Sequence, residues 1–176
     1  MADDAAFLKD LIREIPDWPR PGVGFKDITP LLNDVEAFRY AIDAIATHFG
    51  TDRVDRVLGV EARGFLFAGP VAYRFGAGLV PIRKAGKLPW EIEQEEYVLE
   101  YGTDLLEIHR DGVRPGESVL IVDDVLATGG TASAAARLVE RLGGNVAGFG
   151  FLLELGFLGG RAKLEGYDVL SLLRYE

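Results

Sequence analysis

Two adjacent carboxylates, Asp123 and Asp124, follow an apolar run at 118–122 and precede a glycine-rich turn. The turn reads Ala127-Thr128-Gly129-Gly130-Thr131, and a helical pattern begins directly after it. Glycines let the backbone approach an anion closely, and the unpaired N–H groups at the start of a helix donate to such an anion. The two threonine side chains add hydroxyl donors. We therefore predict that residues 127–131 bind one phosphate monoester.

The two carboxylates need a partner of a different kind. Adjacent acids repel each other, and a nearby phosphate, unless they accept hydrogen bonds from hydroxyl groups or serve a magnesium ion. A ribose 5-phosphate satisfies both parts of the segment, with its diol on Asp123 and Asp124 and its phosphate on the turn. A strand that ends in two acids also occurs in response-regulator domains, so the prediction depends on the full succession of strand, acids, turn and helix.

The surrounding sequence predicts an α/β fold with a mostly parallel, twisted sheet and helices on both faces. Strands that are apolar on both faces and separated by single helices indicate a parallel sheet covered on both sides, and ligands of such sheets bind at the carboxyl ends of the strands. The expected helices cover 7–15, 33–50, 64–75 and 132–142, and the expected strands cover 57–60, 78–82, 118–122, 146–153 and 169–173.

Two stretches do not fit this alternation. Residues 16–24 are too rich in Pro and Gly for a regular element. Residues 84–96 show no helical stripe and lead into 97–101. Because long structureless insertions in compact domains are usually functional, we interpret 84–101 as a flexible lid loop, with an inert hairpin as the alternative. The acid cluster in this stretch is interpreted as solvated.

Composition and charge exclude several classes of protein. The 176 residues, 48% hydrophobic and 27% charged, predict one globular domain over 1–176. The absence of cysteine excludes disulfides and thiolate metal sites. A net charge of −9 disfavours nucleic acid and anionic membranes as partners. With no apolar run long enough to span a bilayer and an acidic start to the chain, we expect a cytoplasmic protein.

The segment 119–131 resembles the phosphoribosyl-pyrophosphate motif of the type I phosphoribosyltransferases. Five further segments resemble, within that family, the adenine phosphoribosyltransferases: 21–29, 61–67, 82–89, 99–102 and 171–176. The resemblance implies the type I fold with a small base-binding hood. It also implies a purine-salvage enzyme that converts adenine and 5-phosphoribosyl 1-pyrophosphate to AMP and pyrophosphate. It further implies a homodimer, and Mg²⁺ held mainly by substrate and water, with Asp123 and Asp124 nearby.

Four cations are candidates for binding the pyrophosphate: Arg63, Arg83, Lys84 and Lys87. Arg63 follows a predicted strand end, and the other three flank the entrance of the insertion. Guanidinium and ammonium donors stabilise charge that develops on a leaving group. The resemblance implies that Arg63 lies beside the pyrophosphate, and that either Arg83 or Lys87 reaches the site of a neighbouring subunit. For Lys84, a solvated surface charge is the alternative.

The resemblance also implies where the base binds. Within an N-terminal base-binding segment at 16–30, Gly24 and Lys26 contact adenine through the main chain and Phe25 lies against the ring, while Leu155 covers the opposite face. Backbone groups distinguish a 6-amino from a 6-oxo purine because an unpaired buried polar group costs about 1–3 kcal/mol.

Two residues of the lid complete the predicted site. By the resemblance, Glu100 is the general acid/base that handles the purine ring proton, and Tyr101 is a further lid residue; an ordinary strand glutamate is the alternative for Glu100. The predicted catalytic set is therefore Glu100, Arg63, Asp123 and Asp124. Two other functions stay open: a transferase for hypoxanthine, guanine or xanthine, and a non-catalytic regulator that binds phosphoribosyl pyrophosphate.

Overall fold

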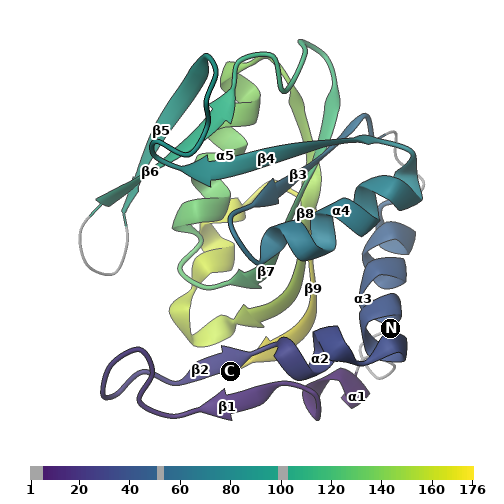
Figure 1. Cartoon of the computed structure of the whole chain (residues 1–176), viewed down its shortest axis with the longest axis vertical. Coiled ribbons are helices and arrows are strands. Elements are labelled where there is room, and N and C mark those ends of the chain that lie inside the picture. Colours follow the sequence, from purple (N-terminus) through teal and green to yellow (C-terminus); the bar gives the residue numbers. More distant parts are fainter. Residues whose placement is uncertain (1–5, 51–53, 99–102) are drawn as a thin grey trace.

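The computed structural model describes residues 6–50, 54–98 and 103–176, and its centre is a seven-stranded sheet of order β5-β6-β4-β3-β7-β8-β9 (Figure 1). The five adjacent strands β4, β3, β7, β8 and β9 are parallel, whereas β6 runs antiparallel to both β4 and β5. The strands are β3 (Arg56–Val60), β4 (Gly78–Lys84), β5 (Ile92–Val98), β6 (Thr103–His109), β7 (Ser118–Leu126), β8 (Asn145–Leu155) and β9 (Val169–Tyr175).

Helices cover both faces of this sheet. Helices α3 (Val35–His48) and α4 (Gly64–Phe75) lie on one face, and α5 (Gly130–Arg141) lies on the other (Figure 1). Because side chains alternate along a strand, Leu120 packs in the cluster beneath α3 and α4, and Ile121 packs in the cluster beneath α5. The predicted fold, a mostly parallel sheet between two helical layers, is confirmed.

The local signals that begin and end two of the helices act as expected. The Asp34 side chain accepts a hydrogen bond from the Ala37 backbone N–H (2.9 Å) and caps α3. Helix α4 ends at Gly76, which adopts φ 63°, a left-handed conformation that glycine takes without steric cost.

The N-terminal segment forms a small layer of its own beside the end of β9 (Figure 1). It consists of α1 (Ala6–Lys9), β1 (Arg13–Ile15), β2 (Phe25–Asp27) and α2 (Thr29–Asn33). The helix predicted over 7–15 is therefore wrong in its second half. Leu8 and Ile12 are buried, which accounts for the helical spacing, but the chain then turns and β1 pairs antiparallel with β2.

The insertion at 84–101 is also different from its prediction. Strand β4 runs to Lys84, and β5 and β6 form an antiparallel hairpin that extends the sheet, with Ile92 opposite His109 and Val98 opposite Thr103. A structureless loop over this whole stretch is therefore wrong, and the stretch between β4 and β5 is only 85–91.

Two connections matter for the site. Strand β7 continues four residues past the predicted end at Val122, so Asp123 and Asp124 lie inside it. Between β8 and β9 the chain forms two short 3₁₀ helices, η1 (Gly156–Leu158) and η2 (Gly160–Leu164).

In the part of the chain that the structure describes, no helix is long and apolar enough to cross a membrane.

Candidate active site

The predicted phosphate turn forms a pocket between β7 and α5. The pocket has a volume of about 70 Å³ and is lined by Asp123 and by residues 125–132. Gly129, the residue before α5, has φ 74°, and α5 begins at Gly130. The first turn of this helix contains no acidic side chain, so its free N–H groups and dipole favour an anion. The structure thus brings the turn and one of the two carboxylates together.

The two carboxylates have different surroundings. The Oδ1 atom of Asp123 accepts a hydrogen bond from the Asp124 backbone N–H (2.9 Å). Asp124 is 5% exposed, and its Oδ2 atom lies 2.6 Å from Nε of Arg63 in an ion pair. Burial, joined by the charge of Asp124, raises the pKa of Asp123 well above its ordinary value. Burial also raises the pKa of Asp124, against the opposing effect of Arg63.

Arg63 joins three segments that are far apart in the sequence. It lies between the end of β3 and the start of α4, and it pairs with Asp124 of β7. Its guanidinium carbon also lies 5.0 Å from the centre of the Phe25 ring, and that ring packs against Trp18 at 4.3 Å. The predicted base-binding segment therefore contacts the predicted pyrophosphate-binding arginine.

The start of α4 approaches β7 more closely than a side chain would allow. A Cβ atom on Gly64 would lie 2.7 Å from Oδ1 of Asp123 and 3.1 Å from the Val122 carbonyl oxygen. Glycine at this position lets the turn that carries Arg63 reach the carboxylates.

The structure places the other three candidate cations differently. Arg83 donates from Nε and Nη2 to the carboxylate of Glu61, at 3.1 and 3.2 Å. Lys84 pairs through Nζ with Asp104 (3.4 Å). Lys87 is exposed, and its carbonyl oxygen accepts from Arg83 (3.3 Å). Of the four cations, the structure therefore brings Arg63 to the carboxylates and gives Arg83 and Lys84 acidic partners elsewhere.

Glu61 is a site residue that the sequence analysis missed. Burial acts to raise its pKa, but hydrogen bonds from Arg83 and from the Lys84 backbone N–H outweigh burial and lower it. Glu61 is thus an anion that fixes the end of β4 against the turn after β3. Its position in the sequence could have indicated this role, because Glu61 lies two residues before Arg63 in the segment 61–67 that carries the family resemblance.

Tyr97 was missed as well. Its hydroxyl group donates to Oδ2 of Asp104 (3.2 Å), the same carboxylate that pairs with Lys84, and the Thr131 side chain lies beside it. Burial, reinforced by the charge of Asp104, raises the pKa of Tyr97 to about 12. A continuous set of contacts therefore runs from the phosphate turn through Tyr97 to Lys84.

The hairpin is attached to the helix that begins at the phosphate turn. Glu95 of β5 forms ion pairs with Arg137 and Arg141 of α5, and Arg141 also donates to the Gln94 carbonyl oxygen (2.6 Å). The interpretation of this acid cluster as solvated is wrong for Glu95. The pairs fix β5 along the side of α5.

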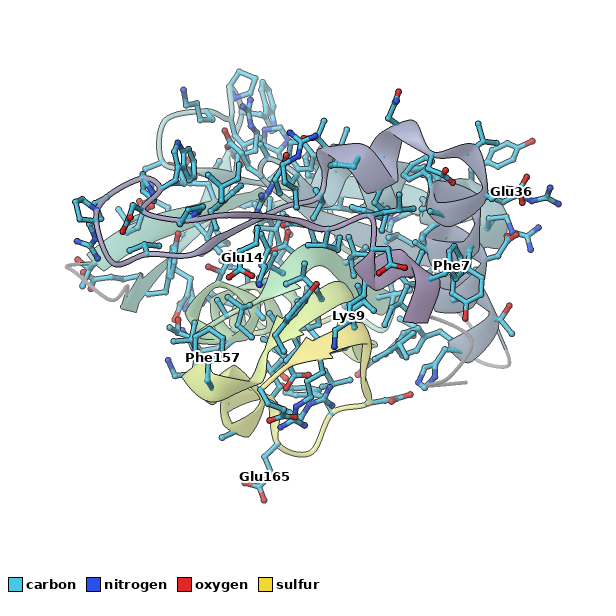
Figure 2. The ribbon with its side chains drawn as sticks, turned by 90° about the horizontal axis from the view of Figure 1, so that it is seen from below. Phe7, Lys9, Glu14, Glu36, Phe157 and Glu165 are labelled. Atoms are coloured by element: carbon cyan, nitrogen blue, oxygen red, sulfur yellow. The ribbon has the colours of Figure 1, made fainter. Side chains whose placement is uncertain are left out.

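The predicted adenine-binding residues come from two elements that meet near the C-terminus. Gly24 precedes β2, Phe25 and Lys26 lie in β2, and Leu155 ends β8 opposite Tyr175 of β9. The ammonium group of Lys26 lies 4.3 Å from the centre of the Tyr175 ring and pairs with Glu14 (2.9 Å). Its side chain is therefore held between the N-terminal layer and the end of β9. Figure 2 shows Glu14 from the underside of the molecule.

Two predicted residues, Glu100 and Tyr101, lie outside the described residues. They stay predictions here. The strands on either side of them belong to the hairpin that Glu95 attaches to α5.

A mostly parallel sheet with a pocket and paired acids at the end of one strand agrees with the predicted class, the phosphoribosyl-transferring proteins. The family described as "Phosphoribosyl transferase domain" matches residues 30–166. The adenine phosphoribosyltransferase of Solibacter usitatus (strain Ellin6076) is 58% identical over 169 residues, which are 96% of this chain and 98% of that one.

Two solved structures are similar over nearly the whole chain. The adenine phosphoribosyltransferase from Thermoanaerobacter pseudethanolicus has a TM-score of 0.94 at 56% identity and covers 97% of this chain and 99% of its own. The enzyme from Saccharomyces cerevisiae, complexed with D-2,5-dideoxy-2,5-imino-altritol 1,6-bisphosphate and adenine, has a TM-score of 0.92 at 42% identity, with coverages of 98% and 100%. The chain belongs to the adenine phosphoribosyltransferase family. The predicted family, activity and enzyme class, a pentosyltransferase that produces AMP in adenine salvage, are confirmed.

Proposed function

We propose that the chain transfers the phosphoribosyl group of 5-phosphoribosyl 1-pyrophosphate to adenine with the residues gathered around β7 and α5. The observation that carries this proposal is the pocket at 125–132 with Asp123 on its wall. A single sugar phosphate then spans the pocket and the carboxylates. The Saccharomyces cerevisiae relative is complexed with an imino-altritol bisphosphate and adenine, which supports a site that takes both a phosphorylated sugar and a base.

The 5′-phosphate lies on Ala127, Thr128, Gly129, Gly130 and Thr131. Backbone N–H groups at the start of α5 donate to its oxygens, as do the two threonine hydroxyls. The Gly160 backbone packs against Ala127 and Gly129, so the turn is oriented before the ligand arrives.

The ribose hydroxyls donate to Asp123 and Asp124, and Arg63 changes partner. Without substrate, Arg63 pairs with Asp124. The pyrophosphate group offers Arg63 a more highly charged partner, so the guanidinium moves to the pyrophosphate and Asp124 becomes free to accept from the sugar. Arg83, Lys84 and Lys87 bind the pyrophosphate from the entrance of the hairpin, or from that of a second subunit.

In the reaction, the bond from C1′ to the pyrophosphate oxygen breaks and adenine N9 forms the new bond to C1′. The electron pair of the broken bond leaves with pyrophosphate, where Arg63 stabilises the developing charge. The proton lost from the purine ring goes to Glu100, acting as general base. Residues 84–101, the lid with Glu100 and Tyr101, exclude water that would hydrolyse the substrate.

Adenine lies between Phe25 and Leu155, and backbone groups at Gly24 and Lys26 distinguish its 6-amino group. Phe25 is already in contact with Arg63, so the base and the pyrophosphate lie on neighbouring parts of one site. This segment, 16–30, and the lid belong to a single domain over 1–176.

A magnesium ion accompanies the substrate. Among the residues that the structure describes, no group of three or more His, Cys, Asp or Glu side chains could hold a metal. Asp123 and Asp124 offer hard oxygen atoms, which suit Mg²⁺, but two carboxylates alone leave most of its six positions to the diphosphate and water. When bound, the ion neutralises charge on the leaving group.

The enzyme is a homodimer in the cytoplasm. Helix α4 and strand β4 carry exposed apolar side chains, Leu66, Tyr73 and Leu79, and Tyr73 is 87% exposed. Such side chains on neighbouring elements are typical of a surface that binds another protein. Tyr73→Asp is expected to shift the mass measured by light scattering from dimer to monomer. An unchanged mass would remove this face from the proposal.

A competition between bases tests the function directly. The purified enzyme receives 5-phosphoribosyl 1-pyrophosphate, Mg²⁺ and an equimolar mixture of adenine, hypoxanthine, guanine and xanthine, and nucleotide products are separated by chromatography. We expect AMP and stoichiometric pyrophosphate. IMP, GMP or XMP as the main product would favour the transferase for oxopurines. Tight ligand binding without pyrophosphate release would favour the regulator.

A further inference from the structure

The connection between β8 and β9 contains a turn, residues 155–160, whose two ends are joined by an ion pair. We call it the fastened turn. Glu154, at the end of β8, and Arg161, in η2, enclose residues 155–160. The guanidinium donates from Nε to both carboxylate oxygens (3.1 and 3.0 Å) and from Nη2 to Oε2 (2.6 Å). Glu154 is 2% exposed, whereas 41% of the Arg161 side chain is exposed, so the carboxylate end of this charge-assisted, multiply hydrogen-bonded pair is buried.

The same arginine reaches the next strand. Its Nη1 donates to the Val169 carbonyl oxygen (2.9 Å) and its Nη2 donates to the Ser171 hydroxyl (3.1 Å). Arg161 therefore joins the end of β8, the helix η2 and the strand β9. Lysine has one charged centre in place of the planar fork and cannot meet all of these acceptors in the same geometry.

One end of the fastened turn lies against the phosphate pocket. A Cβ atom on Gly160 would lie 2.1 Å from the Ala127 carbonyl oxygen and 2.7 Å from the Gly129 backbone nitrogen. Conversely, a Cβ atom on Gly129 would lie 2.3 Å from the Gly160 carbonyl oxygen. The two backbones are in direct contact, so the position of Gly160 sets the position of the phosphate turn.

The other end of the fastened turn is the predicted wall of the adenine site. Leu155 directly follows Glu154 and lies opposite Tyr175 in the sheet. Between the two ends, Phe157 is exposed at the outer edge of the turn, where Figure 2 labels it. The middle of the turn thus faces solvent while its ends face the site.

We propose that Glu154, Arg161 and Gly160 are positioning residues that fix the distance between the 5′-phosphate pocket and the adenine wall. None of the three contacts the reacting atoms. The ion pair holds both ends of the turn, Gly160 supports the phosphate turn, and Leu155 supports the base. This inference rests on the proposed function, because it requires phosphate at 127–131 and adenine at Leu155.

Two variants distinguish the roles of the two ends of the turn. Gly160→Ala displaces the phosphate turn but not Leu155, so we expect AMP binding to weaken about tenfold or more, as when one hydrogen bond to a charged group is lost, with adenosine binding unchanged. Arg161→Lys loosens both ends and weakens AMP and adenosine alike. Isothermal titration calorimetry measures both affinities, and thermal unfolding establishes that each variant is folded.

Matched controls lie beside each position. Gly159 has φ 65° with no atom near its missing side chain, and asparagine tolerates this conformation, so Gly159→Asn is expected to bind both ligands as the unmodified enzyme does. Lys163 is an exposed cation in the same short helix, and Lys163→Ala should likewise bind normally.

A third variant distinguishes failure of this inference from failure of the proposed function. Thr131→Val removes a hydroxyl from the phosphate turn itself. If Thr131→Val weakens AMP binding while Gly160→Ala and Arg161→Lys do not, the positioning role is overturned and the phosphate site stands. If Thr131→Val also binds AMP normally, the phosphate assignment falls and the inference falls with it. Should Arg161→Lys not fold, Gly160→Ala decides alone.

Discussion

Replacing Asp124 with asparagine should reduce activity while leaving the fold at least as stable. Asp124 is 5% exposed, and burial raises its pKa. A desolvated carboxylate reduces the stability of the folded state, and the isosteric amide removes that penalty. The partner, Arg63, keeps 38% of its side chain exposed, so water can solvate the guanidinium once the carboxylate is gone.

Asp124→Asn is thus expected to lower catalytic activity and to raise the free energy of unfolding. A hydrogen bond from a ribose hydroxyl to a charged acceptor contributes about 1.5–3 kcal/mol, so its loss lowers kcat/KM for the phosphoribosyl substrate by about 10- to 160-fold. Relief of the desolvation is expected to add about 1 kcal/mol to the free energy of unfolding at pH 7, which is about 2–4 °C in Tm for a chain of this size.

The pH dependence provides a separate check on the same residue. Because the pKa of Asp124 is raised above its ordinary value of 3.8, the folded state binds the proton more tightly than the unfolded state. The free energy of unfolding of the unmodified enzyme therefore falls as pH rises from the ordinary pKa through the raised one. Asparagine does not titrate, so its advantage in Tm should be present at pH 7 and disappear near the ordinary pKa.

Steady-state kinetics and thermal unfolding by circular dichroism measure both effects. Asp111→Asn, an exposed acid in the loop before β7, serves as a control and should change neither quantity. An Asp124→Asn enzyme that retains full kcat/KM would refute the role in ribose binding. A variant that unfolds more easily by over about 2 kcal/mol would refute the claim that Asp124 is a desolvated anion.

Three further predictions follow from the geometry. Tyr97→Phe removes the hydroxyl that bonds Asp104 and lies beside Thr131, so KM for the phosphoribosyl substrate should rise and stability should fall by about 1 kcal/mol; Tyr40→Phe, on α3, which keeps its ring contact with Phe7, should do neither. Gly64→Ala places a methyl group 2.7 Å from Oδ1 of Asp123, and activity should fall steeply, whereas Gly116→Asn, at a φ of 84° that asparagine tolerates and with open space around it, should be active; equal activities would contradict the close approach. Chelation of Mg²⁺ should abolish AMP formation without changing Tm, since the proposed ion arrives with the substrate; a fall in Tm would indicate a resident metal.

The sequence predicted the centre of this protein because the relevant information is contiguous. The strand, the two acids, the turn and the helix follow one another within 118–142, and each has its own local signal: apolar residues on both faces, glycines in the turn, alanines in the helix. The residues that line the pocket, Asp123 and 125–132, all belong to this segment, although the backbone of Gly160 packs against it from elsewhere in the chain.

The hairpin was only the alternative to a lid loop in the sequence, because its stabilising partners are distant. Strand β5 reads Ile-Glu-Gln-Glu-Glu-Tyr-Val, and its acids suggest a solvated loop when considered alone. Glu95 is instead paired with Arg137 and Arg141, more than forty residues further along, and Glu93 pairs with Arg110. A pattern of polar residues does not reveal which of them have partners in another element.

The same reason explains the contacts around Arg63. The arginine itself was predicted, but its partner Asp124 lies on another strand, and Phe25 comes from the N-terminal layer. Strand pairing between β3 and β7 and the folding of the N-terminal layer beside the sheet bring these residues together. Contacts of this kind between distant residues depend on the tertiary structure and leave no periodic signal in the sequence.

The attachment of the hairpin to α5 has a consequence for protein engineering. The arginines that hold β5 project from the helix whose first turn forms the phosphate pocket. A hairpin transplanted from a relative with another base preference would arrive without its anchors unless the helix came with it. The hairpin and α5 should therefore be transferred together. In a chimera that takes them from different proteins, the residues at both ends of the bound nucleotide should be misplaced.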